Sequence, residues 1–398
     1  MWTDRHVVVG VSGGIASYKS CTLVRRLAEA GARVNVILTD GAAEFVRPLT
    51  FEALSGRPVL TSLWTRDAAL QHVRLAQEAE LAIIAPATAH LLARVAQGLG
   101  DDLLTTLLLA RRGPTLFAPA MNDEMYAHPA TQANLATLSI RGAAFVGPET
   151  GALAEGPSSR PGRMSEPETI LAHAARLLSG RSALRGKRIV VTAGPTREPI
   201  DPVRVVTNRS SGRMGFRLAE AAWERGAEVR LIAGPVSLAA PVGVAVQRVE
   251  TTADMEAAVA EVLPTADVLI MSAAPADYRP AAPSATKRAR EEGELLIPME
   301  PTPDILTRTA EARKPGSLMV GFALETGDAI AKGRAKLARK QLDLIVVNDA
   351  LEPGAAFEVD TNRVVILDRE GGEEVVPLAS KREVAERILD VVERYLGR

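Results

Sequence analysis

A serine and two glycines follow the first strand-like run of the chain, HVVVGV, where they could hold a phosphate. The segment GVSGGIASYKS places Ser12, Gly13 and Gly14 between this run and a predicted helix. Glycine permits a tight turn with close backbone approach, and the free amides at a helix N-terminus attract anions. The segment lacks the dinucleotide pattern G-x-G-x-x-G and a suitably placed ribose-binding acid, which disfavours NAD. Two interpretations remain open, a mononucleotide phosphate site and an ordinary strand-to-helix turn.

A comparable group occurs in the second half of the chain, within TNRSSGRMG. Ser210, Ser211 and Gly212 would surround a phosphate with backbone and hydroxyl donors at a helix start, and Asn208 lies just ahead of them. An ordinary helix cap would use the same residue types. The lysines farther along the chain would, taken alone, belong to solvated surfaces.

Histidine and cysteine divide the chain into two chemically different halves. The second half contains neither, because all five histidines precede residue 179: His6, His72, His90, His128 and His173. The second half therefore has no imidazole base or thiol of its own, and would act by positioning and by electrostatic stabilisation from Lys, Arg, Asn and backbone amides. The single cysteine, Cys21, shares a helical face with Val24 and Ala28, which favours a core position.

Short β-branched runs alternate with helical patterns along the chain, and this alternation predicts an α/β fold with parallel sheets covered on both faces. The pattern restarts at KRIVVTAG after a polar stretch. We predict two doubly wound Rossmann-like domains, at residues 1–178 and 187–398, joined by a linker at 179–186.

Composition narrows the partners and the compartment. The 398 residues include 47 basic and 48 acidic side chains, so the formal charge of −1 provides no general attraction to nucleic acid or to an anionic membrane. No apolar run is long enough to span a bilayer, and a single cysteine excludes an internal disulfide. These features predict a cytoplasmic protein.

The segment GALAEGPSSRPGRM, residues 151–164, has the composition of either a linker or a lid. It lies between the strand-like AAFVGP and a predicted helix, inside the first domain. This position favours a functional insertion.

Motifs along the whole chain together resemble a known family of fused enzymes. GVSGGIASYK, IIAPATA, the segment around His72 and PAMNDEMY resemble the homo-oligomeric flavin-containing cysteine decarboxylases. The segments AAPADYRP, TKRAREEGEL, PTPDIL, GFALET and KLARKQLDLIVVND resemble the ligase half of the same fused family. That family joins phosphopantothenoylcysteine decarboxylase to phosphopantothenate–cysteine ligase, and its first domain is flavodoxin-like.

The resemblance implies two consecutive reactions of coenzyme A biosynthesis. The second half would join L-cysteine to 4′-phosphopantothenate with CTP through an acyl-cytidylate, and the first half would decarboxylate the product to 4′-phosphopantetheine with FMN. Mg²⁺ would accompany CTP, with ligands that the sequence does not assign. Trimeric contacts through the first domain and dimeric contacts through the second would give a homo-oligomer. Two alternatives stay open: an active ligase whose FMN-binding domain is a regulatory scaffold, and a decarboxylase that stops at the enethiol.

For the first half, the resemblance also implies roles for individual residues. His72 would be needed for the chemistry, and Asn122 would hold the substrate carboxylate. The remaining substrate contacts would be Met121, Arg163 and Met164. FMN would bind at Ser12, Gly13, Gly14, Thr39, Thr88 and Ala89.

For the second half, Asn208 would act on the acyl-cytidylate and Lys287 would be catalytic. The implied CTP contacts are Ser210, Ser211, Gly212, Met271, Ser272, Ala273, Asp277, Lys287, Thr302, Pro303, Asp304, Ile305, Phe322, Lys336 and Lys340.

Two residues depart from the family pattern. Thr302 stands where the family has an asparagine; its hydroxyl can still donate a hydrogen bond, but the preference for CTP becomes open. Glu155 stands in the lid at the position of the family's proton-donating cysteine. A carboxylic acid can donate a proton if a closed lid raises its pKa, so we expect Glu155 to replace that cysteine or to position water.

Overall fold

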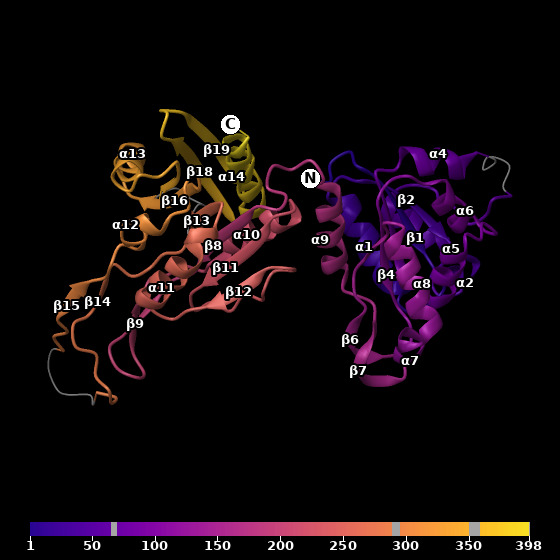
Figure 1. Ribbon diagram of the computed structural model, residues 1–398, viewed down its shortest axis with the longest axis horizontal. Helices are drawn as coiled ribbons and strands as arrows, with labels where there is room; N and C mark the ends of the chain where they lie inside the picture. The colour runs from indigo at the N-terminus through magenta and orange to yellow at the C-terminus, as the bar shows by residue number, and fades with distance from the viewer. Residues whose placement is uncertain (65–69, 289–294, 350–358, 398) are drawn as a thin grey trace. The chain divides into compact units, whose positions relative to one another are not determined.

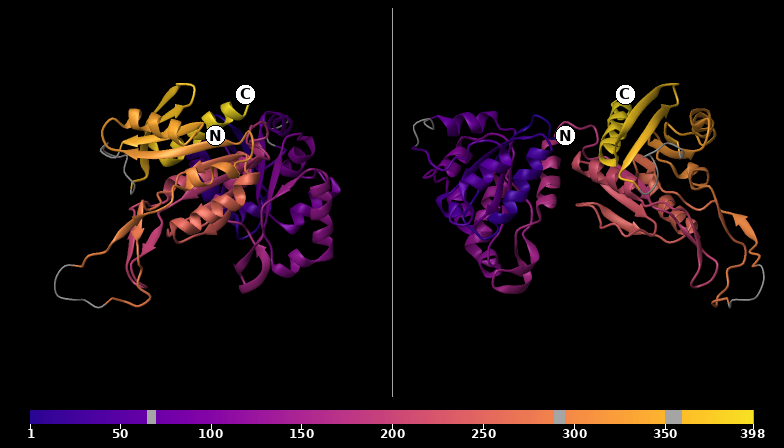
Figure 2. Two further views of the ribbon diagram at one scale, coloured as in Figure 1. Left: turned by 60° about the vertical axis from the view of Figure 1, so that its left-hand side comes forward. Right: turned by 180° about the vertical axis from the view of Figure 1, so that it is seen from behind.

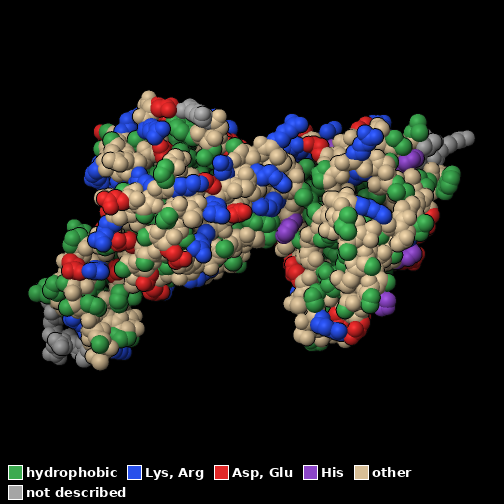
Figure 3. Space-filling model, in the orientation of Figure 1, with side chains coloured by type: hydrophobic (Ala, Val, Ile, Leu, Met, Phe, Trp, Pro, Cys, Tyr) green, Lys and Arg blue, Asp and Glu red, His purple; other side chains and the backbone are tan. Residues whose placement is uncertain are grey.

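The computed structural model describes residues 1–64, 70–288, 295–349 and 359–397 (Figure 1). The chain forms two compact units, Met1–Leu178 and Ser179–Arg398. Among the described residues, no helix is both long and apolar enough to cross a membrane. Basic and acidic side chains are interspersed on the face shown in Figure 3, in keeping with the formal charge of −1.

A five-stranded parallel sheet forms the centre of the first unit, in the order β2-β1-β3-β4-β5. Its strands are apolar runs, and β1 and β3 are buried throughout because helices cover both faces. This strand order is the flavodoxin-like one, which confirms the predicted fold class of the first domain. The strands are β1 (His6–Val11), β2 (Arg33–Leu38), β3 (Leu81–Ala87), β4 (Thr115–Pro119) and β5 (Ala144–Phe145).

Helices cover both faces of this sheet (Figures 1 and 2). An apolar core lies on each face. One core joins the sheet to α1 (Ser17–Glu29), α3 (Pro48–Ser55) and α9 (Pro167–Leu178). The other joins it to α4 (Gln71–Glu78), α5 (Ala89–Gln97), α6 (Leu103–Ala110) and α8 (Pro129–Ile140). The short helices are α2 (Asp40–Ala43) and α7 (Asp123–Ala127).

The segment at residues 151–164 forms most of an antiparallel hairpin outside the sheet. Its strands are β6 (Glu149–Leu153) and β7 (Gly156–Arg163). The hairpin connects β5 to α9 within the first unit. The segment is therefore not the boundary between the units.

An eight-stranded sheet forms the centre of the second unit, in the order β12-β11-β8-β13-β16-β17-β18-β19. Its first six strands are parallel and follow the Rossmann order, and β18 and β19 extend it in antiparallel fashion. The prediction of a second doubly wound α/β domain is confirmed. The strands are β8 (Arg188–Ala193), β11 (Glu228–Ala233), β12 (Ala245–Arg248), β13 (Val268–Met271), β16 (Leu318–Glu325), β17 (Leu344–Asp349), β18 (Thr361–Asp368) and β19 (Glu373–Ser380).

Helices cover both faces of this sheet as well. α10 (Arg213–Glu224) and α14 (Lys381–Leu396) pack together on one face. The core on the other face involves α11 (Thr252–Val262), α12 (Ile305–Arg308) and α13 (Ala329–Arg339), while η1 (Leu263–Thr265) and η2 (Ala310–Ala312) are single 3₁₀ turns. Two small ladders complete the unit: β9 (Arg197–Pro199) with β10 (Val205–Thr207), and β14 (Tyr278–Pro280) with β15 (Met299–Pro301). Figure 1 shows β14 and β15 on an arm that projects from the sheet.

Residues 179–186, predicted as a linker, group with the second unit. Leu184 is fully buried, and the Ser182 hydroxyl donates to Glu393 Oε1 of α14 at 2.5 Å. This segment therefore packs on the unit that follows it.

Candidate active sites

A cavity of about 980 Å³ in the first unit is lined by residues that follow β1, β2 and β3. The strand order reverses between β1 and β3, and open α/β sheets bind ligands in the crevice at such a reversal. The volume lies at the upper end of the range for small-molecule sites. All six residues predicted to bind FMN line this cavity: Ser12, Gly13, Gly14, Thr39, Thr88 and Ala89.

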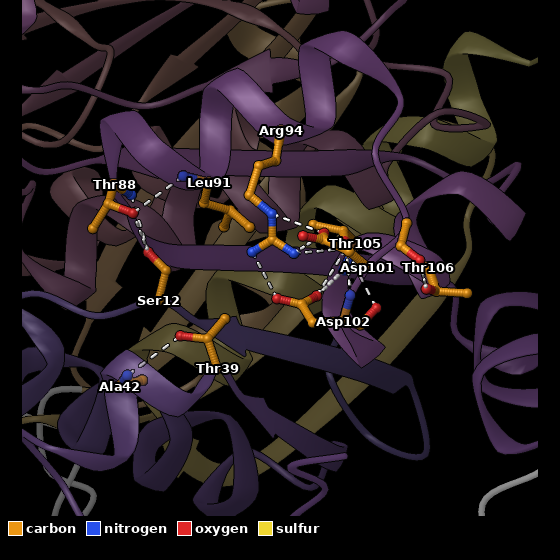
Figure 4. Close-up of polar contacts among 11 residues, drawn as sticks. Ser12, Thr39, Ala42, Thr88, Leu91, Arg94, Asp101, Asp102, Thr105 and Thr106 are labelled. Atoms are coloured by element: carbon orange, nitrogen blue, oxygen red, sulfur yellow. Dashed lines mark hydrogen bonds and ion pairs between the residues drawn. The ribbon is translucent and has the colours of Figure 1, made fainter. Parts of the chain in front are cut away.

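Hydroxyl groups brace the turns around this cavity (Figure 4). Ser12 Oγ accepts from the Thr88 amide at 3.0 Å and lies 2.8 Å from the Pro86 carbonyl oxygen. Thr39 and Thr88 cap α2 and α5, accepting from the amides of Ala42 and Leu91, each at 3.3 Å. In contrast, α1 begins without a side-chain cap, and its first amides donate to the turn before it: Ser17 N to the Gly14 carbonyl and Lys19 N to the Ala16 carbonyl, each at 3.0 Å.

The glycine turn is too close to the next turn to hold a side chain. A Cβ on Gly13 would lie 2.7 Å from the backbone carbonyl carbon of Gly41. Backbone alone therefore forms this wall of the cavity, as a phosphate cradle requires. This close approach fits a phosphate-bearing cofactor such as FMN.

Asn122 caps α7 and also lines the cavity, next to Met121. Its Oδ1 accepts from the amides of Glu124 at 2.9 Å and Met125 at 3.4 Å. Among the described residues, no hydrogen bond uses its Nδ2. The cap thus fixes the side chain while an amide donor stays available for a carboxylate.

The β6–β7 hairpin forms one wall of the cavity through Glu155, Arg163 and Met164. Glu155 is exposed between the two strands. The base of the hairpin is fixed because Lys19, which is buried, donates from Nζ to the Met164 carbonyl at 3.0 Å and to Glu166 Oε1 at 2.9 Å. The hydrogen bond from Lys19 holds the pKa of Glu166 below its ordinary value.

The end of β7 packs against the turn before α7. The Met121 amide donates to the Gly162 carbonyl at 3.0 Å. A Cβ on Gly162 would lie 2.6 Å from the Met121 carbonyl oxygen. The hairpin and the substrate-binding turn are therefore in direct backbone contact.

His72 does not line this cavity. It lies in the first turn of α4, and within the described ranges its buried Nδ1 has no hydrogen-bond partner. The segment just before it, residues 65–69, lies outside the described residues. The sequence did not predict that His72 would lie away from the other predicted residues of this site.

Sequence analysis missed two cations that line the cavity, the buried Lys19 and the partly buried Arg94. Arg94 Nη1 pairs with Asp102 at 2.8 Å and its Nε donates to Asp101 at 2.9 Å (Figure 4). Burial lowers the pKa of Arg94, but these two carboxylates outweigh burial and raise it. Lys19 lies within the glycine motif, yet its burial could not be read from the motif.

The second unit contains a cavity of about 500 Å³ at the corresponding reversal of strand order, between β8 and β13. Every predicted CTP contact except Lys287 lines it, as does Asn208. These residues come from the start of α10, the segment after β13, the segment before α12, β16 and α13.

Main-chain contacts already occupy two of the predicted polar groups. Asn208 Nδ2 donates to the carbonyls of Ala274 at 3.2 Å and Pro275 at 2.9 Å, which leaves its Oδ1 for a ligand. The Thr302 hydroxyl donates to the Ala276 carbonyl at 2.5 Å. Since its proton is used there, Thr302 can offer a ligand only an acceptor.

Both predicted lysines of α13 face carboxylates. Lys336 Nζ pairs with Glu325, and Lys340 Nζ pairs with Asp304 at 3.0 Å. Burial raises the pKa of Asp304, but the hydrogen bond and charge of Lys340 outweigh burial and lower it. A nucleotide phosphate would compete with these carboxylates.

Lys287 lies outside the cavity, exposed in the loop between β14 and β15. Residues 289–294 of that loop are not among the described residues. Next to Lys287, the Arg288 amide donates to Asp201 Oδ2 at 3.2 Å. Asp201 is buried and was not predicted.

Four more polar residues at the second cavity were missed: Arg213, Asn348, Asn362 and Lys381. For metals, no group of three or more His, Cys, Asp or Glu side chains in the described parts of the chain could hold an ion. The side chains described thus offer no ready-made Mg²⁺ site.

Comparison with known proteins gives one family for each unit and one for the whole chain. Residues 1–179 match the Flavoprotein family, and residues 184–396 match the DNA/pantothenate metabolism flavoprotein C-terminal domain. The coenzyme A biosynthesis bifunctional protein CoaBC of Mycobacterium tuberculosis is 49% identical over 408 residues, covering 99% of this chain and 97% of that protein. The protein of the same name in Bacillus subtilis is 44% identical over 397 residues, covering 98% of this chain and 97% of that protein.

The chain belongs to the coenzyme A biosynthesis bifunctional protein family. It is a flavoprotein and a bifunctional enzyme, with phosphopantothenoylcysteine decarboxylase and phosphopantothenate–cysteine ligase activities. The two alternatives, a regulatory flavin module and a decarboxylase that stops at the enethiol, are not favoured.

Solved structures resemble the separate units. The crystal structure of a CoaBC C-terminal domain is 41% identical and covers 54% of this chain and 98% of that chain, with a TM-score of 0.47. An FMN-dependent cysteine decarboxylase, SpaF, is 27% identical and covers 44% of this chain and 97% of that chain, with a TM-score of 0.39.

Proposed function

We propose that the second unit joins L-cysteine to 4′-phosphopantothenate with CTP, and that the first unit decarboxylates the product with FMN. The observation that carries this proposal is the convergence of the predicted residues, except His72 and Lys287, on two separate cavities, each at a reversal of strand order.

In the first unit, FMN would be held by the Gly13–Gly14 turn and the hydroxyl-braced turns after β2 and β3. When bound, FMN supplies reversible two-electron chemistry. The Asn122 Nδ2 donors would hold the substrate carboxylate until it leaves as CO₂. Arg163 and Met164 would contact the substrate from the hairpin, and Glu155 would donate the last proton. His72 is proposed as the catalytic histidine.

In the second unit, a substrate carboxylate oxygen would attack the α-phosphorus of CTP, forming the acyl-cytidylate and releasing pyrophosphate. The cysteine amine would then attack the acyl carbon, lose a proton and release CMP. Lys336, Lys340 and Lys287 would neutralise charge at the phosphates, and the amides at the start of α10 would add hydrogen bonds. Asn208 would contact the acyl-cytidylate through its free Oδ1. No acid–base histidine is required.

We propose that Mg²⁺ enters the second unit bound to CTP. Cells supply triphosphates as magnesium complexes, and Mg²⁺ commonly keeps few protein ligands. We also propose a cytoplasmic homo-oligomer with trimeric contacts through the first unit and dimeric contacts through the second. Mass measurement in solution, on the full chain and on each unit, tests this assembly.

One assay tests the proposed reactions. Purified protein with 4′-phosphopantothenate, L-cysteine, CTP and Mg²⁺ should yield CMP, pyrophosphate, CO₂ and 4′-phosphopantetheine. Ligase product that accumulates without CO₂ would contradict the decarboxylase assignment, and a product two hydrogens short would show that reduction fails. A preparation unable to take up FMN would contradict the cofactor. Chelation of Mg²⁺ should stop CMP formation and leave decarboxylation of added 4′-phosphopantothenoylcysteine intact.

A further inference from the structure

Three buried polar side chains of the second unit lie outside its cavity and have no role so far: Thr196, Glu198 and Thr252. Thr196 follows β8, Glu198 lies in the middle of β9, and Thr252 is the first residue of α11. Their exposed fractions are 0%, 3% and 1%. Buried hydroxyl and carboxylate groups are hydrogen-bonded in folded proteins, so their partners indicate what these side chains hold in place.

The three side chains form a chain of hydrogen bonds that runs in one direction. The Glu198 carboxylate accepts from the Thr252 amide and from the Thr252 hydroxyl, each at 2.8 Å, whereas the Ala276 carbonyl is 3.5 Å from that hydroxyl. Because the only proton of the Thr252 hydroxyl points to Glu198, Thr196 is the donor in the 2.9 Å contact between the two threonine hydroxyls. Thr196 Oγ1 in turn accepts from the Ala276 amide at 2.9 Å. Each bond polarises the next, and the last acceptor is a carboxylate, which strengthens the chain.

The far end of this chain, Ala276, belongs to a segment that lines the cavity after β13, residues 274–277. The segment is also fixed by other contacts. The Ala274 amide donates to the Gly194 carbonyl at 2.9 Å, and the Ala276 carbonyl accepts from the Thr302 hydroxyl at 2.5 Å. Ala276 is therefore held by Thr196 at its amide and by Thr302 at its carbonyl.

The same segment orients Asn208. Asn208 Nδ2 donates to the carbonyls of Ala274 at 3.2 Å and Pro275 at 2.9 Å, which directs its Oδ1 away from these carbonyls. The positions of the two carbonyls thus set the direction of the Asn208 oxygen. A displacement of about 1 Å at a reacting group can lower a rate by about 100-fold, so the support of residues 274–276 affects the chemistry.

We propose that Thr196, Thr252 and Glu198 are positioning residues of the ligase reaction, an assignment that rests on the proposed function of the second unit. They hold residues 274–276 so that Asn208 presents its Oδ1 to the acyl-cytidylate. Since all three lie outside the cavity, they act through Asn208 and not on the substrates.

Thr196→Val tests this chain of hydrogen bonds, because valine has nearly the shape of threonine and lacks the hydroxyl. The Ala276 amide would lose its acceptor, so kcat for CMP release by the full chain should fall by about 10- to 100-fold, while the KM for CTP stays within about threefold. Thr196→Ser keeps the hydroxyl and should retain kcat within about threefold of the wild type. Thr252→Val and Thr252→Ser repeat the comparison one bond farther along, and they keep it open if Thr196→Val fails to fold.

A double-mutant cycle separates positioning of Asn208 from a general effect on the second unit. In an Asn208→Ala enzyme the group to be positioned is gone, so adding Thr196→Val should lower the remaining kcat by less than about twofold. Independent effects would instead multiply.

Thr309→Val is the matched control. Thr309 is also buried, and its hydroxyl donates to the Ile305 carbonyl at 2.7 Å, which accepts from the Thr309 amide at 2.9 Å as well. Its removal leaves that carbonyl with a donor, so kcat should stay within about twofold of the wild type.

Three results would each overturn the assignment: a wild-type kcat in folded Thr196→Val, an equal loss in Thr196→Ser, and a full further loss in the Asn208→Ala enzyme. Decarboxylation of added 4′-phosphopantothenoylcysteine should proceed at the wild-type rate in every variant, since it belongs to the first unit. Absence of CMP release from the wild type would instead contradict the proposed ligase function itself.

Discussion

At the scale of single residues, a substitution of Gly13 tests whether the glycine turn after β1 binds FMN. A Cβ there would lie 2.7 Å from the Gly41 backbone, so Gly13→Ala must force two turns apart. We expect the variant to purify without visible flavin absorbance and to release no CO₂, while CMP formation continues. Gly180→Ala is the control, because a Cβ on Gly180 meets no heavy atom within 4 Å. A yellow Gly13→Ala protein with wild-type FMN affinity would contradict FMN binding at the glycine turn.

Glu155 tests the source of one proton. The side chain is exposed at the tip of the hairpin and lines the cavity, where a carboxylic acid can donate a proton and an amide cannot. Glu155→Gln should leave CO₂ release in place and lower the yield of saturated thiol by at least about tenfold. Mass spectrometry of the product separates the saturated and the unsaturated thiol. Glu44 is an exposed glutamate outside the cavity, so the control Glu44→Gln should leave the product ratio unchanged. An unchanged product ratio in Glu155→Gln would remove Glu155 from the mechanism.

At the scale of elements, the hairpin acts as a wall only if β7 stays packed on the turn before α7. A Cβ on Gly162 would lie 2.6 Å from the Met121 carbonyl oxygen. Gly162→Ala should therefore displace the hairpin and cost about 1–3 kcal/mol of stability in the first unit. Thermal release of the flavin should occur at a lower temperature, and the KM for decarboxylation should rise. Equal melting of Gly162→Ala and Gly180→Ala would show that this contact is not needed.

The arm that carries Lys287 is anchored by a hydrogen bond from the Arg288 amide to the Asp201 carboxylate. Asp201 is buried and accepts from the amides of Val203 and Arg204, each at 2.8 Å, and from the Arg288 amide at 3.2 Å. Burial raises the pKa of Asp201, but these donors and Arg204 outweigh burial and lower it. Asp201→Asn would turn an acceptor into a donor that faces other donors. CMP formation should slow while added 4′-phosphopantothenoylcysteine is decarboxylated at the wild-type rate; equal slowing of both reactions would contradict this anchoring role.

At the scale of the whole molecule, the central strands could be predicted because their apolar runs are continuous and bounded by turn residues. The edge strands β12 and β19 were missed, since they are partly exposed and their runs contain charged or polar residues. The hairpin was predicted as a lid but not as two strands. Its second strand contains two prolines and two glycines, which disfavour a sheet and are tolerated in an isolated edge ladder.

Site residues could be predicted where they follow parallel strands, because the carboxyl ends of such strands converge at one edge. Ser12, Thr39 and Thr88 are of this type. Asn362 and Lys381 are not, since they belong to an antiparallel extension whose place in the sheet the sequence does not specify. The burial of Lys381 depends on the packing of α14 against α10, which no local pattern reveals.

The division of the chain into two units with separate cores and separate cavities predicts that the two activities can be removed one at a time. His72 belongs to the first unit, and the second has no histidine, so His72→Asn should abolish CO₂ release and leave CMP formation unchanged. His128→Asn is a matched control: His128 caps α8 through Nδ1, at 3.2 Å from the Ala130 amide, and asparagine is a good cap residue. Both reactions should be followed on the same folded preparation, with FMN content measured beside them. If His72→Asn lost both activities with its flavin bound and its ligase unit folded, the chemistry would not be divided between the units as the two cavities indicate.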